Sequence, residues 1–151
     1  MKFSKSQINL FTLLKLPSVW LCGIRVTFLK GSVCEAKVKY RWINQNPFNS
    51  MFWAVQGMAA ELTTGILIMK EIQLSKKKVS MLVLNNKASF SKKAKGRITF
   101  SCNSDDLISN AIQKLIATNK PQTLWLTSKG MDEKNDLVST FEFEWTLLIK
   151  K

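Results

Sequence analysis

The segment from Met51 to Met69 carries one ionisable side chain, Glu61, in an otherwise uncharged run. Three interpretations are open for such a run. It could be a membrane span or an active-site helix that presents its one carboxylate for chemistry. It could also be a core helix whose carboxylate is satisfied by a Thr, Asn, Lys or backbone amide of the sheet, because a buried charge without partners is costly.

The membrane interpretation fits the residue types poorly. A span needs about twenty apolar residues, whereas this run also contains Gln56, Thr63 and Thr64. A carboxylate near the bilayer centre costs at least ~2.5 kcal/mol on insertion scales. We therefore expect no membrane span.

The face of the helix around Glu61 is made of small residues. Positions three, four, seven and eight residues away share that face; they include Ala54, Gly57, Met58, Thr64, Gly65 and Ile68. A glycine inside a helix costs about 1 kcal/mol relative to alanine. We expect close approach of another group, backbone or ligand, to compensate for this cost.

The composition excludes several kinds of chemistry. The chain has no histidine, which rules out histidine acid–base catalysis, Ser-His-Asp triads and histidine metal sites. Its three cysteines, Cys22, Cys34 and Cys102, are scattered and form no CxxC pattern. We therefore predict no metal site and no disulfide framework, and a reducing, cytoplasmic compartment.

The net charge of +13 is the most unusual number in the composition. It implies attraction to an anion such as nucleic acid, an acidic membrane surface or a phosphorylated ligand. Only Arg25, Arg41 and Arg97 are arginines, which disfavours bidentate readout of bases. The aromatic residues alternate at core-type positions rather than among the lysines, so we regard nucleic-acid binding as an unfavoured alternative.

We expect residues 1–151 to form one domain, with a helical segment at residues 1–20. The N-terminus superficially suggests a signal peptide, but Lys15 and Pro17 interrupt its apolar run. The plainer interpretation is a short amphipathic helix that ends before Pro17 and has Ile8, Phe11 and Leu14 on one side.

The rest of the chain predicts an α+β fold. A hairpin is expected over 24–43, with Cys34, Ala36, Val38, Tyr40 and Trp42 facing the core. The long helix should start at a cap on Asn49 or Ser50 and end near Lys70. Strands are expected at 79–90, 96–102, 122–128 and 137–150, and a second helix, capped by Asn103 or Ser104, at 104–119. About six half-wet strands predict a curved antiparallel sheet wrapped around the one long helix.

This order of elements resembles the hotdog superfamily, whose members are largely acyl-CoA thioesterases and dehydratases. The closest likeness is to thioesterases of the phenylacetate-pathway type. In those, an Asn stands upstream of His-Gly-Gly, and Leu-Ala-Asp follows within the helix. Here Asn46 stands upstream, Phe52-Trp53-Ala54 replaces His-Gly-Gly, and Ala59-Ala60-Glu61 takes the place of Leu-Ala-Asp.

The resemblance implies a set of roles. Glu61 would be the general base or nucleophile, and backbone amides around Phe52 to Val55 would polarise the thioester carbonyl. Gln56, Thr64 and Asn46 would orient water. It implies a homodimer or dimer of dimers with the site between subunits, and no cofactor beyond the coenzyme A of the substrate.

The acyl group and coenzyme A would meet two sets of residues. An acyl tunnel would be lined by Phe52, Trp53, Gly57, Met58 and Gly65. The phosphates would meet Lys92, Lys93, Lys95 and Arg97, or Lys76 to Lys78. Because the His-Gly pair is missing, the alternative is a non-catalytic hotdog module that binds an acyl or aromatic ligand.

Overall fold

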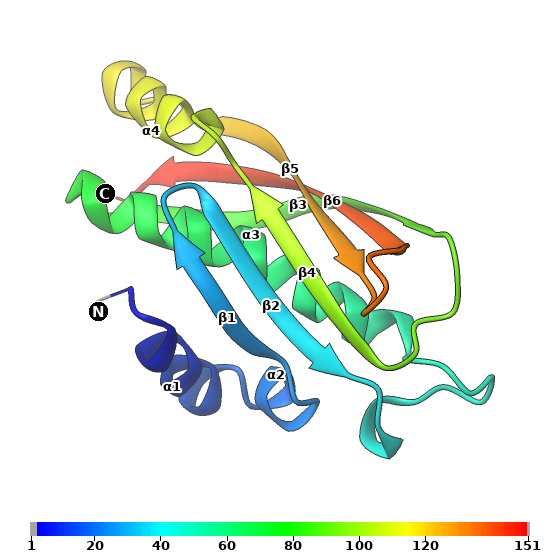
Figure 1. Ribbon diagram of the computed structural model, residues 1–151. Helices are drawn as coiled ribbons and strands as arrows, with labels where there is room; N and C mark the ends of the chain where they lie inside the picture. The colour runs from blue at the N-terminus through cyan, green and yellow to red at the C-terminus, as the bar shows by residue number, and fades with distance from the viewer. Residues whose placement is uncertain (1–2, 151) are drawn as a thin grey trace.

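The computed structural model describes residues 3–150, which form one curved antiparallel sheet wrapped around a long helix (Figure 1). The strand order across the sheet is β1-β2-β4-β5-β6-β3. The strands are β1 (Arg25–Lys30), β2 (Val33–Lys39), β3 (Val79–Phe90), β4 (Arg97–Asn103), β5 (Gln122–Met131) and β6 (Leu137–Ile149). The long helix α3 (Trp53–Ser75) lies against the concave face. The predicted α+β architecture is confirmed.

Alternation of apolar and polar residues builds the strands. In β6, Phe141, Phe143, Trp145 and Leu147 are buried, while the residues between them reach the other face. These four apolar side chains therefore share one face of the sheet, as the period of two predicts.

The first hairpin departs from its prediction at one end. Cys34, Ala36 and Val38 are buried as expected, but Trp42 is 82% exposed. Strand β2 ends at Lys39, and a 3-10 turn, η1 (Trp42–Asn44), follows. The buried Asn44 fixes this turn: its amide donates to the carbonyls of Cys22 and Lys39 at 3.1 and 2.9 Å, so the strand cannot continue through Trp42.

Helix α3 starts and ends later than predicted. Its N-cap is Phe52, which makes no side-chain cap hydrogen bond, so a cap on Asn49 or Ser50 was wrong. Those two residues lie in a turn held by Asn46, which accepts from the Ser50 amide at 3.2 Å. The helix also continues five residues beyond Lys70, to Ser75, and ends where Lys76 adopts a left-handed φ of 55°.

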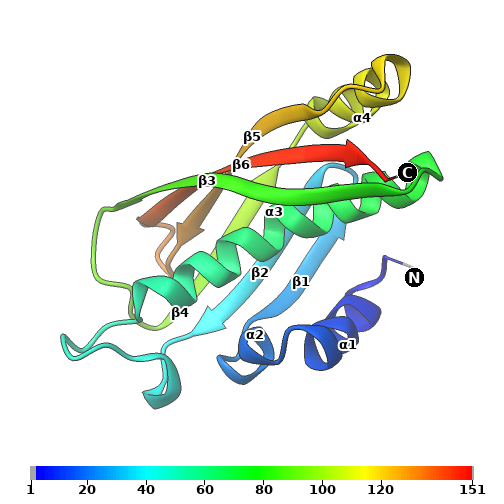
Figure 2. The same ribbon diagram turned by 180° about the vertical axis from the view of Figure 1, so that it is seen from behind.

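Two short helices precede the sheet and lie along β1, at the edge of the sheet away from β3 (Figure 2). They are α1 (Lys5–Lys15) and α2 (Pro17–Leu21). Helix α1 ends before Pro17 as predicted, but its Leu14 is 68% exposed, while Ile8 is fully buried. Asn9 fixes this face: its side chain accepts from the Val26 amide and donates to the Val26 carbonyl, at 2.9 and 3.0 Å.

Helix α4 (Leu107–Thr118) packs on β5, β6 and α3. Ile108, Ile112 and Leu115 are buried, and this is narrower than the predicted apolar stripe because Leu107 is 54% exposed. The N-cap is Asp106 without a side-chain cap bond, so the predicted caps at Asn103 or Ser104 were wrong. No helix within residues 3–150 is long and apolar enough to cross a membrane.

Candidate functional site

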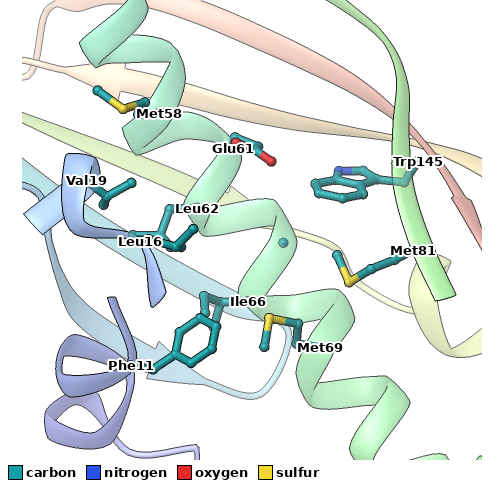
Figure 3. A pocket seen from close by; sticks show the side chains of 11 residues that line it. Phe11, Leu16, Val19, Met58, Glu61, Leu62, Ile66, Met69, Met81 and Trp145 are labelled. Atoms are coloured by element: carbon teal, nitrogen blue, oxygen red, sulfur yellow. The ribbon is translucent and has the colours of Figure 1, made fainter. Parts of the chain in front are cut away.

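A cavity of about 210 Å³ opens beside Glu61, and we call it the Glu61 cavity (Figure 3). One side is α3, another is the pair α1 and α2, and the third is the β3 side of the sheet. Its lining is Phe11, Leu16, Val19, Met58, Glu61, Leu62, Gly65, Ile66, Met69, Met81 and Trp145. Glu61 is the only ionisable side chain in this lining.

The Glu61 carboxyl is open to water on one side and faces apolar side chains on the other (Figure 3). Within residues 3–150 it has no hydrogen bond and no ion pair, and its apolar surroundings raise its pKa above the ordinary value of 4.5. In the single chain Glu61 is therefore exposed rather than held inside the sheet, although rings of the sheet pack against the neighbouring glycines of this face. The carboxylate is nevertheless unpartnered, so its lone pairs are available for chemistry.

The two glycines near Glu61 accommodate rings of the sheet. A β-carbon built on Gly57 would lie 3.4 Å from a ring carbon of Phe141, and one on Gly65 would lie 3.5 Å from the indole of Trp145. The predicted close approach is thus made by β6 side chains, and only Gly65 of the pair lines the Glu61 cavity.

Thr64 holds Trp145 at the cavity wall. The Thr64 hydroxyl accepts from the Trp145 indole N–H at 3.1 Å and donates to the Glu61 carbonyl at 2.9 Å. The hydroxyl hydrogen of Thr64 is therefore already donated within the protein. Thr64 positions the indole beside Glu61, rather than presenting a free hydroxyl to water.

A second cavity, of about 410 Å³, lies at the start of α3, and we call it the Asn46 cavity. It is lined by Asn46, Phe48, Ser50, Met51, Trp53, Gln56, Phe90, Ser91, Lys92, Lys93 and Ala94. Asn46 accepts from the amides of Phe48 and Ser50 at 2.9 and 3.2 Å. The buried Gln56 accepts from the Ser139 hydroxyl at 2.8 Å. Of the four predicted catalytic residues, these two therefore lie away from the Glu61 cavity.

Phe52 and Trp53 also lie at the start of α3. Both are exposed, and their rings meet edge to face with centroids 6.0 Å apart. The Val55 amide donates to the Phe52 carbonyl at 3.0 Å, and the Phe52 amide donates to the Asn44 carbonyl at 2.9 Å. Of the amides predicted to polarise a carbonyl, those of Trp53 and Ala54 find no acceptor within the described chain.

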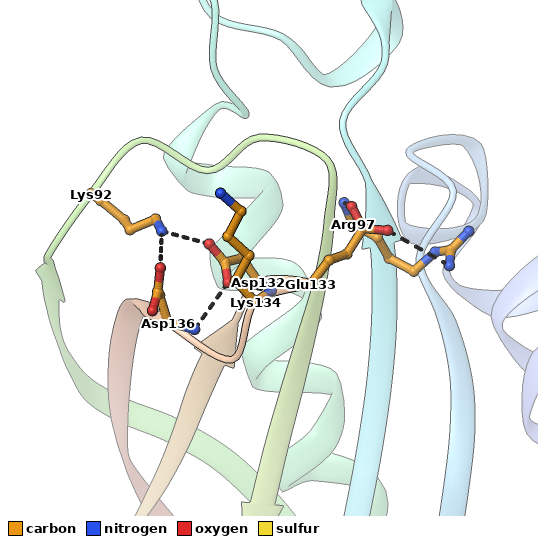
Figure 4. A network of polar contacts seen from close by, with 6 residues as sticks. All are labelled: Lys92, Arg97, Asp132, Glu133, Lys134 and Asp136. Carbon is orange, nitrogen blue, oxygen red and sulfur yellow. Dashed lines mark hydrogen bonds and ion pairs between the residues drawn. The ribbon is translucent and has the colours of Figure 1, made fainter.

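Three of the predicted phosphate-binding residues, Lys92, Lys93 and Arg97, have partners for their side chains within the described chain. Lys92 donates to Asp132 at 2.6 Å and to Asp136 at 2.8 Å, as Figure 4 shows. Hydrogen bonding by Lys92, and then by the Asp136 amide, lowers the pKa of Asp132 to about 2.

The other basic residues of this set differ in their side-chain contacts. Arg97 approaches Glu133 at 4.0 Å, and the Lys93 ammonium donates to the Phe48 carbonyl at 3.0 Å. Lys95 has no side-chain partner in the part of the chain described. None of these residues, nor Lys92, lines the Glu61 cavity.

Sequence reasoning missed most of the cavity wall. Met81 of β3 and Leu16 and Val19 from the N-terminal helices line it without having been singled out. The inward alternation of β3 and β6 could have pointed to Met81. Nothing in the sequence indicates that the N-terminal helices reach the Glu61 face of α3. Residues 3–150 contain no group of three His, Cys, Asp or Glu side chains that could hold a metal ion.

Known structures share this architecture. A protein of unknown function from Pseudomonas aeruginosa, described as a probable thioesterase, matches with TM-score 0.86 and 19% identity over 99% of both chains. A thioesterase from Haemophilus influenzae matches with TM-score 0.74 and 14% identity over 99% of this chain and 93% of its own. A variant of a thioesterase from Staphylococcus aureus matches with TM-score 0.70 and 13% identity over 87% and 98%.

At these identities the likeness establishes the fold, which is the hotdog fold of thioesterase-like proteins. A family model then places the chain more narrowly. It matches residues 4–147, and the chain therefore belongs to the family described as a domain of unknown function, DUF4442. No curated protein matches the sequence at a significant level.

Proposed function

We propose that this protein hydrolyses an acyl-CoA type thioester, with Glu61 as general base or nucleophile. The observation that carries the proposal is the unpartnered Glu61 carboxylate in the wall of an apolar cavity, where burial raises its pKa. A carboxylate in this setting is a stronger base than one in water.

The reaction needs one proton acceptor and one polarising group. As a base, Glu61 takes a proton from water while the water oxygen attacks the thioester carbonyl carbon and the carbonyl electrons move to oxygen. When the carbonyl re-forms, the carbon–sulfur bond breaks and the departing thiolate takes the proton from Glu61. As a nucleophile, the carboxylate would attack the carbonyl carbon and the carbon–sulfur bond would break, so that a mixed anhydride forms and a thiolate leaves. Water would then cleave the anhydride, which releases the acid, regenerates the Glu61 carboxylate and supplies the proton that the thiolate takes.

The polarising group is proposed to come from a second copy of the chain. The free amides of Trp53 and Ala54 suit a developing oxyanion, because a helix N-terminus favours negative charge. Trp53 lies eight residues before Glu61 in α3, about 12 Å along the helix axis. That distance is too long for both groups to act on one carbonyl within a single chain.

The edge of the sheet offers a way to form such a dimer. Strand β3 is twelve residues long, pairs only with β6 among the described strands, and is exposed over most of its length. Because an open edge of this length readily pairs with another strand, we propose that β3 pairs with β3 of a second copy. Both copies of α3 would then lie on the same face of a continuous sheet.

Mass measurement by light scattering tests this dimer. Leu84→Lys places a charge on the β3 edge and should convert the dimer to a monomer. Leu148→Lys is the matched control, because Leu148 is 48% exposed against 47% for Leu84 but lies on the internal strand β6. A dimer that survives Leu84→Lys would remove β3 from the proposal.

The hydrolysis itself is tested with purified protein and a panel of short, long and aromatic acyl-CoA thioesters. We expect turnover that Glu61→Gln lowers by at least about 100-fold, the usual contribution of a positioned general base. Glu71→Gln, on the same helix but outside the Glu61 cavity, should keep the parental rate. Full turnover in Glu61→Gln would overturn the proposed role.

The alternative function is that of a non-catalytic module that binds an acyl or aromatic ligand. The exposed rings of Phe52 and Trp53, which take the place of the His-Gly pair of the resembling branch, favour it. The exposed rings of Phe48 and Phe90 in the lining of the Asn46 cavity add to this apolar surface. Saturable acyl-CoA binding without turnover would support this alternative.

Within the thioesterase proposal, we also propose membership of the phenylacetate-pathway branch, which the sequence positions of Asn46 and Glu61 support. Branch membership does not fix the acyl group, and the aliphatic and aromatic thioesters of the panel decide it. The three thiols are free, which agrees with the cytoplasmic location we propose.

A further inference from the structure

A second depression along α3 borders the Glu61 cavity. This depression, of about 450 Å³, shares Phe11, Met69 and Met81 with the Glu61 cavity and extends to Lys76 and Lys77 after the end of α3. Figure 3 places Glu61 at one end of the cavity and Phe11 with Met69 at the other. We call the joined space the α3 trough and its three shared residues the junction.

The walls of the trough suit an alkyl chain. Between Glu61 at one end and Gln73, Lys76 and Lys77 at the other, the lining side chains are aliphatic, aromatic or methionine. The amide groups of a pantetheine arm would lose their hydrogen bonds to water there without gaining others, which is unfavourable. Methylene groups lose nothing of this kind, and methionine side chains adapt to their shape.

The length of the trough sets the length of the alkyl chain that it can bind. The rise of an α-helix is about 1.5 Å per residue, so Met69 lies about 12 Å and Gln73 about 18 Å beyond Glu61. An extended alkyl chain advances by about 1.25 Å per carbon, because bonds of about 1.5 Å meet at tetrahedral angles. The junction therefore lies roughly 10 carbons from Glu61, and Gln73, near the end of α3, roughly 14 carbons from it.

We propose that the α3 trough binds the alkyl chain of a fatty acyl thioester of roughly 10 to 14 carbons, with its carbonyl at Glu61. This inference rests on the proposed hydrolysis of acyl thioesters and adds the substrate class. The N-terminal helices limit the length of the bound alkyl chain, because Phe11 of α1 narrows the junction together with Met69 of α3 and Met81 of β3.

Substitution at the junction tests whether these residues limit the length of the bound alkyl chain. Met81→Trp should fill the junction and exclude about four methylenes of a 14-carbon chain. Each excluded methylene costs about a factor of four in affinity, so turnover of the 14-carbon thioester should fall on the order of 100-fold. The 8-carbon thioester, which ends before the junction, should stay within about twofold.

Two further variants keep the test decisive. Leu107→Trp is the control, because Leu107 is 54% exposed on α4 and lies outside the trough and away from the β3 edge. Phe11→Ala widens the junction and should shift the preferred chain length upwards. Thermal unfolding establishes that each variant is folded.

A second measurement separates the trough from the chemistry. Binding of saturated fatty acids of 8 and 14 carbons, measured by calorimetry, needs no hydrolysis. Tighter binding of the longer acid, lost in Met81→Trp and kept in Leu107→Trp, supports the trough even if no thioester turns over.

Turnover in which Met81→Trp leaves the ratio of 14-carbon to 8-carbon rates unchanged would overturn the trough and leave the proposed hydrolysis intact. Absence of turnover together with length-independent fatty-acid binding would overturn both.

Discussion

The Glu61 cavity and the Asn46 cavity lie on the same helix and differ in how their polar groups are satisfied. Around the Asn46 cavity, Gln56, Asn46, Lys92 and Lys93 each have a hydrogen-bond partner within the protein. In the Glu61 cavity the one carboxylate has none within the described chain. A satisfied group holds the fold, whereas an unsatisfied one can bind or react. The difference teaches that residue type alone does not separate structural from reactive side chains.

Gln56→Leu should have the largest effect on stability. It leaves the buried Ser139 hydroxyl without its acceptor and removes the bond to the Met51 carbonyl. Because an orphaned buried polar group costs about 1–3 kcal/mol, the free energy of unfolding in urea should fall by about that amount.

Gln56→Leu combined with Ser139→Ala should be less destabilising than the two separate effects summed, since both partners are then apolar. If Gln56→Leu kept its stability but lost thioester turnover, the Asn46 cavity would be the reactive one and the comparison would fail.

Gly65→Ala should stabilise the protein by up to about 1 kcal/mol, because its β-carbon meets Trp145 at an ordinary contact distance and alanine favours the helix. Such a gain corresponds to about 2–4 °C in melting temperature for a domain of this size. Since the new methyl group lies in the wall of the Glu61 cavity, a change in turnover despite higher stability would sharpen the comparison.

Gly130→Ala serves as the contrasting control. Its β-carbon would lie 2.6 Å from a Phe100 ring carbon, so it should lower the melting temperature. A destabilised Gly65→Ala would mean that the indole of Trp145 is held more tightly than its distance suggests.

Glu61→Gln should make stability less dependent on pH. The pKa of Glu61 is raised in the folded chain, so folding favours its protonated form, and stability declines as the pH rises through that value. At about pH 7 the variant should melt slightly above the parent, by less than about 3 °C, and at about pH 4 the two should coincide. A variant that melts lower at neutral pH would indicate a partner for the carboxylate, such as a second subunit.

Lys92→Met should change the pKa of Asp132 and have little effect on the Glu61 cavity. Without the ammonium group, the pKa of Asp132 should rise from about 2 towards its ordinary value of 3.8. The depressed pKa stabilises the fold above the unfolded value, and this contribution is lost as the pH falls towards 2. Carbon NMR of the Asp132 carboxyl measures the change. A weakened affinity for coenzyme A in this variant would restore Lys92 as a phosphate ligand.

Much of the fold could be predicted from the sequence because local pattern and tertiary packing agree. The alternation from Phe141 to Leu147 predicts a strand with one dry face. The uncharged run around Glu61 leaves three interpretations open, and the half-wet strands that need a cover favour a helix beneath a sheet. Trp42 broke its pattern because Asn44, a single buried amide, ends the strand with bonds to Cys22 and Lys39 that no periodicity contains.

Of the residues that line the Glu61 cavity, Glu61, Met58 and Gly65 could be given a role from the sequence. Glu61 stands out because nothing near it in sequence shares its charge. Gln56 and Thr64 have suitable side chains, yet their partners, Ser139 and Trp145, come from a strand about eighty residues later. Which polar groups lack a hydrogen-bond partner is decided by the folded chain. A sequence therefore indicates candidate residues but not whether each of them has a partner.

The bond between Asn9 and both backbone groups of Val26 has a consequence for assembly. With α1 packed along β1, one border of the sheet is sealed by its own chain, while β3 remains open at the opposite border. A further strand can therefore add to the sheet only at β3. In two molecules joined through β3, both outer edges of the sheet are β1 strands covered by α1. Growth of this kind ends at a pair, and a filament would first require the N-terminal helix to detach.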